Sequence, residues 1–399
     1  EGHDDSANAN ANINININTN IVYRYKIFAG CYDVSTAKEK LPPLDGTTTS
    51  TRKQSDETTN DGHVEVDVIP FQLDVTKQSD VDSAVRMVDE WLLLGSKQEE
   101  AKKTETETET ETKTHKTTKT IRLMHAVVNN AGVGRLGQVD WLSIDDYKIC
   151  MEVNAFGPIR MCKAFMPLMK RQYIQQIKRE SRRANSKSKW WSKLSSIYSL
   201  LFRPVQYRPR IINLSSAGGI VALGGVGGSA YLMSKHAIDA FTQTFRYEAR
   251  QWNIDVVSVN PSFHQTPLLT KTSTGMESCD YVREDTRNEY GNEYIKRFAG
   301  YVNWCMMSTA WESSNVAYAL IEAIETPKPP TQMIVGIDAK YGMCLLRMMP
   351  EWFRELFAQI VTPTNVPAII KDAKTAKVDH APSKNGTLVE SDNTSKKDL

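Results

Sequence analysis

The chain has 399 residues, and its 49 basic and 47 acidic side chains nearly cancel to a net charge of +2. This balance gives no overall field that would attract nucleic acid, so we expect no nucleic-acid partner. The six cysteines lack the paired spacing of a metal site, and we predict buried, reduced thiols and no bound metal. No apolar run reaches the roughly 18 residues of a membrane span.

Several segments are too polar or too repetitive to contribute to a core. Residues 1–20 are predicted as a low-complexity segment and residues 364–399 as a disordered polar tail. Three insertions are predicted between a helix and the next strand, at residues 45–62, 97–119 and 171–209. What remains, residues 21–363, suits a single α/β domain.

The packed part of the chain begins with two apolar runs, residues 21–31 and 64–73, which are predicted as buried strands. A helix over residues 79–94 follows, because apolar side chains recur there at helical spacing. Asp74 and Val75 lie between the second strand and this helix. On position alone, Asp74 suits a helix cap as well as it suits a ligand-binding residue.

The next strand covers residues 121–128 and ends in a turn of small residues, Asn130-Ala131-Gly132. Small side chains let a ligand approach the backbone, although the same residues would suit an ordinary turn. Residues 145–171 are predicted as a helix that carries Asn154. A buried structural amide is one interpretation of that asparagine.

Two more strands are predicted at residues 210–213 and 255–260, and the candidate catalytic residues lie between them. The first leads into Ser215 and Ser216, and a helix after it holds Tyr231 and Lys235. The second leads into a loop that contains Pro261, Phe263 and Thr266.

Tyr231 and Lys235 are four residues apart, which places both side chains on one face of a helix. A phenol titrates near 10 in water, and a neighbouring cation should lower its pKa by favouring the phenolate. A hydroxyl such as that of Ser216 could hold a substrate oxygen beside the phenol. This combination can move a proton on or off a carbinol, which is the partner step of hydride transfer.

A Tyr-x-x-x-Lys pair alone is a weak signal, but it occurs here with VVNNAG at 127–132, VNAFG at 153–157, IINLSS at 211–216 and VVSVNP at 256–261. The order and spacing of these motifs resemble the short-chain dehydrogenase/reductase superfamily, over about residues 21–363. The resemblance implies a Rossmann-like, doubly wound parallel sheet and a nicotinamide cofactor. We favour NAD over NADP because no Arg or Lys directly follows Cys31, where the second strand of the family would end.

The resemblance also implies roles for individual residues. The catalytic set would be Tyr231, Lys235, Ser216 and Asn154, with Asn154 holding a water that links Lys235 to solvent. The cofactor would contact Tyr231 and Lys235 together with Asp74, Val75, Asn130, Ala131, Gly132, Pro261, Phe263 and Thr266.

One part of the family pattern is missing from this sequence. No Thr-Gly-x-x-x-Gly-x-Gly motif occurs, and no strand or helix that could carry it precedes Ile21. In a sheet ordered 3-2-1-4-5-6 the first strand is central, so its absence would leave two strands without a neighbour. We therefore expect a fragment, or a gene model that lacks its start, with weak dinucleotide binding. Ser262 also stands where relatives have glycine, which puts the geometry of that loop in doubt.

Residues 335–340 and 349–352 resemble the branch that contains retinol and hydroxysteroid dehydrogenases, and D-3-hydroxybutyrate dehydrogenase is a further relative. A lipophilic alcohol or ketone needs an apolar cleft, for which the candidates are Phe298, Trp304, Met306, Met307 and Trp311. Hydroxybutyrate needs a cation, for which the candidates are Arg135, Arg297 and Lys271. Core packing and solvent exposure are the plain alternatives for these residues. We favour the lipophilic alcohol and keep a non-catalytic scaffold as a further alternative.

Residues 170–210 contain twelve Lys or Arg side chains against one acid, Glu180. Within this stretch, apolar residues at 190, 194, 197 and 201 fit a helix lying on a membrane surface. We favour a solvated basic insertion over this peripheral membrane contact. The resemblance implies a homo-oligomer in an intracellular location, with the endoplasmic reticulum surface and the mitochondrion as candidates.

Overall fold

The computed structural model describes residues 23–33, 64–106, 122–185, 208–222, 228–270, 282–361, 367 and 369–370. These residues belong to two compact units, residues 1–123 and 124–399. The prediction of a single domain over residues 21–363 stays a prediction. Residues 1–20 and 45–62 lie outside the described part of the chain, as does the apolar pattern between residues 190 and 201.

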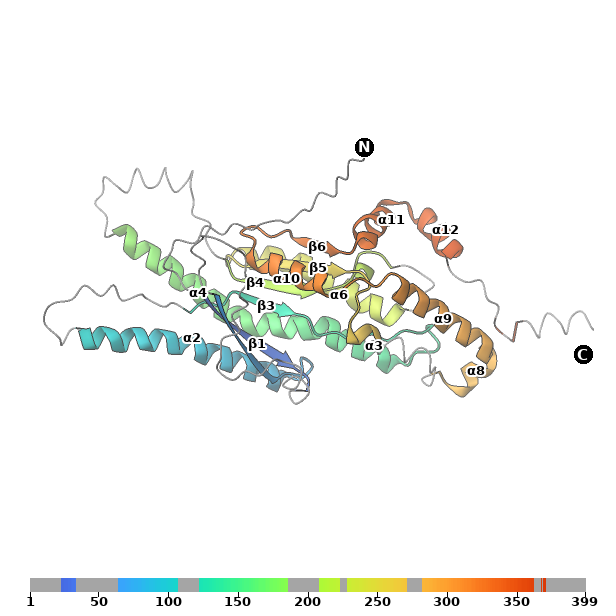
Figure 1. The fold of residues 1–399 in the computed structure, drawn as a ribbon, viewed down its shortest axis with the longest axis horizontal. Coiled ribbons are helices and arrows are strands. Elements are labelled where there is room, and N and C mark those ends of the chain that lie inside the picture. The colour runs from blue at the N-terminus through green and yellow to red at the C-terminus, as the bar shows by residue number, and fades with distance from the viewer. Residues whose placement is uncertain are drawn as a thin grey trace, which may run out of the picture. The chain divides into compact units, whose positions relative to one another are not determined.

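The first unit contains both strands that were predicted at its start. Strand β1 (Tyr23–Cys31) pairs in parallel with β2 (Val64–Gln72), with Tyr23 opposite Val64 and Cys31 opposite Gln72 (Figure 1). Helix α2 (Gln78–Thr106) follows and buries Val81, Ala84 and Val88.

Helix α2 is longer than the predicted helix over residues 79–94. It continues to Thr106, into the segment that was predicted as an insertion. Lys, Gln, Glu and Ala dominate residues 97–103, and all four favour helix even where nothing packs against them.

The second unit contains a four-stranded parallel sheet in the order β3 (Ala126–Asn129), β4 (Arg210–Leu214), β5 (Asp255–Pro261) and β6 (Gln332–Val335). The parallel α/β class is therefore confirmed. Strand β6 was not predicted, because its four residues are short of a clear period and only Met333 is fully buried.

The strands of the described residues form two separate sheets, one of two strands and one of four. Strand β1 pairs with β2, and β3 pairs with β4. No described strand joins β1 to β3, as we expected from a sequence without the central first strand.

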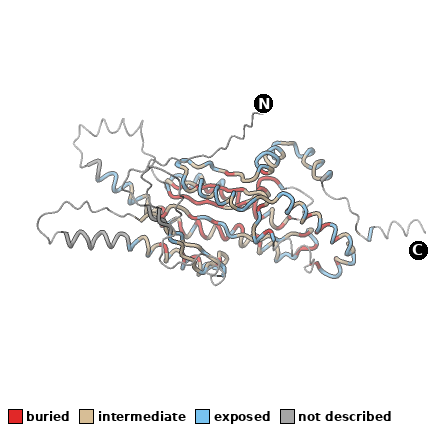
Figure 2. Tube along the Cα trace, in the orientation of Figure 1, coloured by how far each residue is buried: buried red, intermediate tan, exposed pale blue. Residues whose placement is uncertain are grey.

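Alternation along β4 and β5 decides which helix covers each face of the four-stranded sheet, since successive side chains point to opposite faces. Ile212, Val257 and Val259 pack against α10 (Ser314–Glu325) through its alanines. The alternate side chains, Asn213 and Ser258, face α6 (Ser229–Arg250). Figure 2 shows the buried residues concentrated along these strands and the helices beside them.

A chain of helices leads from β3 back to β4. Helix α3 (Ile144–Met151) begins with a capping box between Ser143 and Asp146, a π-helix (Glu152–Phe156) follows, and α4 (Gly157–Asn185) completes the run. The predicted helix over residues 145–171 is therefore correct in type, but it contains a π-turn at Asn154 and extends farther. The side chains of residues 177–182 in α4 are exposed.

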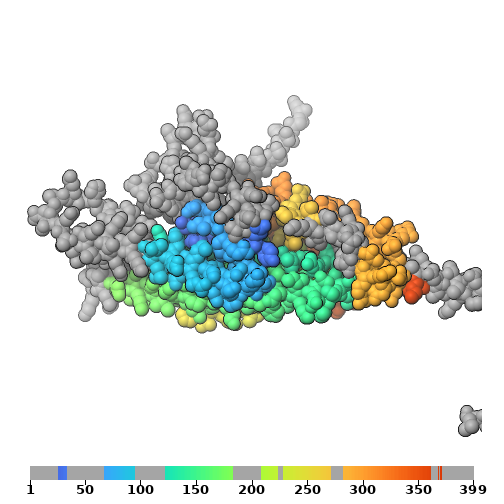
Figure 3. Space-filling model, turned by 90° about the horizontal axis from the view of Figure 1, so that it is seen from below, coloured from blue at the N-terminus to red at the C-terminus, as the bar shows by residue number. Residues whose placement is uncertain are grey.

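Helices α8 (Glu284–Tyr290) and α9 (Asn292–Ser308) form an apolar layer with Trp141. The Trp141 ring meets Tyr290, Tyr294 and Phe298 edge to face, with ring centroids 5.4, 6.3 and 5.1 Å away. In Figure 3 the orange atoms of α8 and α9 lie beside the green atoms of the α3 region on the surface of the second unit. A π-helix (Asp338–Met343), α11 (Cys344–Met348) and α12 (Glu351–Val361) follow β6.

The described residues contain no cluster of His, Cys, Asp and Glu that could hold a metal ion. Cys31, Cys150, Cys162, Cys305 and Cys344 are free thiols, and Cys279 lies outside the described residues. Within the same described ranges, no helix has both the length and the apolar character that a bilayer crossing requires.

Gly219 ends the short 3-10 helix Ala217–Gly219 after β4, at a place with no room for a side chain. An added Cβ would lie 2.5 Å from the carboxylate of Asp239, 2.5 Å from the hydroxyl of Ser215 and 2.8 Å from the Lys235 carbonyl. We predict that Gly219→Ala lowers the free energy of unfolding by about 1–3 kcal/mol, measured by urea denaturation.

Gly300 offers a matched control, because it lies in the exposed interior of α9 and an added Cβ there would have no atom within 4 Å. Gly300→Ala should stabilise the chain by roughly 0.5–1 kcal/mol. Equal effects of the two substitutions would contradict the packing described for Gly219.

Candidate active site

The carboxyl ends of β4 and β5 and the first turns of α6 bring the predicted catalytic residues together. Ser215 and Ser216 directly follow β4, and Pro261 ends β5. Helix α6 starts at Ser229 after Gly228, whose site has Leu136 and Leu232 within van der Waals distance of an added Cβ. Residues 223–227, within the glycine-rich loop between these segments, lie outside the described residues.

Tyr231 and Lys235 lie on one face of α6, as their spacing predicts. The Lys235 ammonium is 5.6 Å from the centroid of the Tyr231 ring and donates a hydrogen bond of 3.0 Å to the Leu214 carbonyl. Only 5% of Lys235 is exposed, so this is a cation held inside the protein between α6 and the end of β4.

The sequence predicts that Lys235 lowers the pKa of Tyr231, but in the structure the pKa of this phenol is raised. Burial raises the pKa of Tyr231 above its ordinary value, and the hydroxyl of Ser216 opposes this through a hydrogen bond. The ammonium is directed to a backbone carbonyl instead of the phenol oxygen, which explains why desolvation dominates. Tyr231 is therefore held as a neutral phenol, which suits a proton donor.

The same burial acts on Lys235 in the opposite sense. Desolvation lowers the pKa of Lys235 to about 8, while the carboxylate of Asp239 and the nearby Cys150 oppose this shift. A lysine with this pKa carries its charge at neutral pH and loses it under mildly alkaline conditions.

The structure distinguishes between the two serines. The Ser215 hydroxyl is buried and donates to the Asp239 carboxylate over 2.9 Å, with the Lys235 carbonyl 3.1 Å away. Ser216 is the serine that bonds the phenol of Tyr231, and it also accepts from the Gly218 amide over 3.2 Å. The geometry therefore favours Ser216, as the sequence spacing did.

Asn154 lies in the π-helix between α3 and α4 and is almost fully buried. Its side-chain amide donates to the Val133 carbonyl and the Ser234 hydroxyl, each over 2.9 Å, and its oxygen accepts from the Val133 amide over 2.8 Å. These bonds make it a structural amide that ties the turn after β3 to α6. The catalytic role that the resemblance implies for Asn154 stays a prediction.

The turn Asn130-Ala131-Gly132 brings backbone close to the catalytic residues. Asn130 and Ala131 are exposed, and an added Cβ at Gly132 would lie 3.5 Å from Asn154 Oδ1 and 3.7 Å from Lys235 Nζ. Since this is ordinary contact distance, the small residue leaves the edge of the site open beside the ammonium.

The loop after β5 frames the other side of the site. The Pro261 carbonyl lies 3.5 Å from the Ser216 hydroxyl, and Phe263 packs on the Trp141 cluster. Thr266 acts locally as a helix cap, accepting from the Leu269 amide over 3.4 Å. Ser262 has no left-handed backbone conformation, because Asn253 is the one described non-glycine residue with a positive φ. Serine in place of the expected glycine therefore adds no backbone strain, although its hydroxyl is buried without a hydrogen-bond partner.

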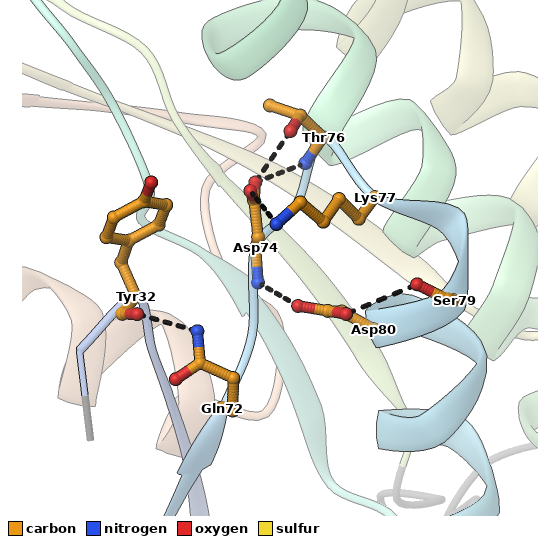
Figure 4. Close-up of polar contacts among 7 residues, drawn as sticks. All are labelled: Tyr32, Gln72, Asp74, Thr76, Lys77, Ser79 and Asp80. Atoms are coloured by element: carbon orange, nitrogen blue, oxygen red, sulfur yellow. Dashed lines mark hydrogen bonds and ion pairs between the residues drawn. The ribbon is translucent and has the colours of Figure 1, made fainter.

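Asp74 and Val75 belong to the first unit, in the turn between β2 and α2. The Asp74 carboxylate accepts from the Thr76 amide over 3.0 Å and the Thr76 hydroxyl over 2.7 Å, and Lys77 lies 3.5 Å away (Figure 4). Burial opposes ionisation, but these bonds and the Lys77 charge hold the pKa of Asp74 below its usual value. These contacts close a local turn ahead of α2, which begins at Gln78, so Asp74 is not a helix cap and its role as a ligand-binding residue stays a prediction. Cys31 bonds the Ala29 carbonyl, and Asp33 is exposed.

The five candidate residues for an apolar cleft do not converge. Phe298 and Met306 are buried in the Trp141 cluster, whereas Trp304 and Met307 are 66% and 51% exposed on the outer side of α9. Trp311 donates to the carboxylate of Asp338 over 2.9 Å. Helical spacing explains this division, because residues 298, 302 and 306 share one face and residues 304 and 307 do not.

The candidate cations are paired or outside the described residues. Arg135 contacts Asp146 over 3.2 Å and Arg297 contacts Glu293 over 2.5 Å, both at exposed positions. Lys271 lies outside the described part of the chain.

The site also contains residues that the motifs did not indicate. Asp239, Ser258 and Asn260 are buried beneath Ser215 and Lys235 and bond to one another. The signal in the sequence is that Asp239 lies four residues after Lys235, on the same helix face as two predicted site residues.

Comparisons with known proteins show what this chain is similar to. The chain matches the short chain dehydrogenase family over residues 93–177 and 200–277. It is 27% identical over 228 residues to Dehydrogenase/reductase SDR family member 9 of Bos taurus, covering 56% of this chain and 60% of that one. It is also 27% identical over 232 residues to 3beta-hydroxysteroid dehydrogenase dhs-16 of Caenorhabditis elegans, covering 57% and 44%. A solved short-chain dehydrogenase from Streptomyces avermitilis aligns with 15% identity and a TM-score of 0.48 over 89% of this chain and 90% of that one.

The family match includes the turn after β3, both serines and the Tyr231–Lys235 pair, so the chain is similar to short chain dehydrogenases over the part that carries the candidate site. The chain covers 60% of the length of the Bos taurus relative and 44% of the length of the Caenorhabditis elegans relative.

The depressed pKa of Lys235 predicts a pH-dependent stability. Between pH 8 and 10 the unfolded chain holds a proton on this lysine that the folded chain has released, so stability rises with pH in that window. Relative to Lys235→Met, the wild-type free energy of unfolding should rise by at most about 1.4 kcal/mol per pH unit above pH 8, and stay flat below it.

Urea denaturation at a series of pH values measures this difference, and Lys296→Met, at an exposed position on α9, is the control. A wild-type curve parallel to that of Lys235→Met between pH 8 and 10 would show that the ammonium is not desolvated.

Proposed function

We propose that this protein is an NAD(P)-dependent oxidoreductase that interconverts a lipophilic alcohol, of the retinoid or hydroxysteroid class, and its carbonyl. The observation that carries the proposal is the convergence of Tyr231, Ser216 and Lys235 at the carboxyl edge of the β3–β6 sheet. The carboxyl edge of a parallel sheet is where α/β proteins of this class bind their ligands.

Each residue has a role that follows from its contacts. Ser216 holds the substrate oxygen beside the phenol, and Tyr231 gives its proton to that oxygen during reduction and takes it back during oxidation. Because burial keeps Tyr231 protonated, reduction is the direction in which the phenol starts in the correct state. Lys235 keeps a positive charge 5.6 Å from the centre of the Tyr231 ring, at the edge of the sheet where the cofactor would bind.

The described residues fit the nicotinamide end of a dinucleotide. Lys235 gives one of its three N–H donors to the Leu214 carbonyl, so the others can bind ribose hydroxyls beside the open turn at Gly132. A bound nicotinamide would supply the hydride. The sequence has no glycine-rich phosphate motif, so the residues that would hold the pyrophosphate are not evident. We propose NAD in preference to NADP.

An apolar substrate is supported by what surrounds the site. Leu136 lies beside Gly228, just before α6, and Phe263 lies in the loop after β5. Both side chains pack on the Trp141 cluster. An apolar layer therefore borders the loops that carry the catalytic groups. Arg135 and Arg297, the described candidates for a carboxylate-binding cation, are already paired with acids, which makes a D-3-hydroxybutyrate substrate the weaker proposal. The 3beta-hydroxysteroid relative has the same substrate class in its name.

Tyr231→Phe should lower the turnover of ketone reduction by at least about 10²-fold, because the proton donor is removed while the ring remains. The measurement is NADH- or NADPH-dependent reduction of a 3-ketosteroid, a 17-ketosteroid, retinal and acetoacetate. Tyr247→Phe, at an exposed position on the same helix, should leave turnover unchanged. Near-normal turnover by Tyr231→Phe would refute the assigned role.

Dinucleotide binding separates the enzyme from the non-catalytic alternative. We expect NADH to bind, with an affinity lowered by the absence of the phosphate motif, and NADPH to bind more weakly. Fluorescence titration of the full chain measures both affinities. An absence of binding and turnover with every ketone would support the scaffold. We also propose that the protein forms a homo-oligomer and acts inside the cell.

A further inference from the structure

Below the catalytic groups, one carboxylate accepts hydrogen bonds from two strands. Asp239 lies on α6, one turn after Lys235, and is 4% exposed. One of its oxygens accepts from the Ser215 hydroxyl over 2.9 Å and from the Asn260 side-chain amide over 2.7 Å. The other accepts from the Ser258 hydroxyl over 2.5 Å.

These contacts extend to the catalytic serine. The Asn260 amide that binds Asp239 also donates to the backbone carbonyl of Ser216, over 3.0 Å. The Ser215 hydroxyl binds Asp239 directly, so the backbone of Ser216 is fixed both through its own carbonyl and through the residue before it. Gly219 closes the cluster, because an added Cβ there would lie 2.5 Å from both the Asp239 and Ser215 oxygens.

The charge of Asp239 matters as much as its shape. All three groups that contact it are donors, which is the arrangement that an ionised carboxylate requires, since it can only accept. Removing the charge while keeping the donors would leave N–H and O–H groups facing one another inside the protein.

The geometry points to Asp239 as a positioning residue of this site, which fixes the Ser216 backbone through Ser215 and Asn260 and keeps the neighbouring Lys235 in its charged form. The inference rests on the proposed function for its kinetic consequences alone. The effect of Asp239 on the charge of Lys235 concerns the folded chain and can be measured without turnover.

The groups that face Lys235 and Asp239 define what else could titrate there. Tyr231 and Asp239 from α6 and Cys150 from α3 lie around the ammonium, and Arg246 on α6 also interacts with Asp239. Glu152, in the π-helix that packs against α6, is paired with Arg160. Asp239 supports the charge on Lys235 against the burial that lowers its pKa to about 8.

The first test compares Asp239→Asn with wild type in the stability measurement that involves Lys235. We expect the pH above which wild type gains stability over Lys235→Met to be about 8. In the Asp239→Asn background, with Asp239→Asn/Lys235→Met as the reference, this onset should fall by about one pH unit. An identical onset in the two backgrounds would overturn the electrostatic part, whether or not the protein shows turnover.

The second test is kinetic and uses ketone reduction. In Asp239→Asn, kcat should fall at least about 10-fold with little change in KM. The decline of the rate at alkaline pH should begin about one unit earlier than in wild type. Asp239→Glu, which restores the charge, should restore the wild-type onset. A lower kcat with an unchanged pH profile would reduce Asp239 to a structural residue and overturn the inference.

Ser258→Ala is the matched control, because it removes one donor to the same carboxylate without changing the charge. It should lower the urea midpoint and leave the pH onset in place. If Asp239→Asn does not fold, Ser215→Ala tests the positional part, with an expected loss of kcat of about 10-fold at an unchanged onset. Wild-type kcat in Ser215→Ala would then refute the inference.

Discussion

A single buried carboxylate joins the helix and the two strands that make up the candidate site. Without Asp239, the hydroxyls and the amide that converge on it would be buried donors without an acceptor, and each would cost about 1–3 kcal/mol. The carboxylate in turn tolerates burial only because these donors solvate it. The mutual dependence explains why Ser258 and Asn260 occupy alternate positions of β5, a strand whose buried apolar residues are all valines.

The fold was predictable from the sequence where hydrophobic period and composition gave one answer. The strands at residues 23–31, 64–72, 210–214 and 255–261 lie close to the predicted ranges, because each is an apolar run of adequate length. Helix ends were not predictable, because α2 and α4 continue into mostly polar segments of high helix propensity. Strand β6 was missed because four residues, one buried and three half-buried, carry too little pattern.

The site shows the same division. Motif spacing indicated Tyr231, Lys235 and Ser216, which the structure brings together. It could not indicate the state of the phenol, because burial depends on the tertiary surroundings and here raises the pKa of Tyr231. Nor could the aromatic candidates be sorted, since Phe298 and Trp304 differ in their orientation around α9 and not in their chemistry. The hydrogen bonds of Asp74 required coordinates for the same reason.

The separation of the strands into two sheets has a consequence for how the protein opens. Among the described residues, the first unit pairs two strands and buries Val81, Ala84 and Val88, whereas the second has four strands and several apolar clusters. Local opening costs less where fewer apolar contacts are lost, so backbone amides of β1 and β2 should exchange with deuterium before those of β4 and β5. A single melting temperature for this chain would then average two separate events.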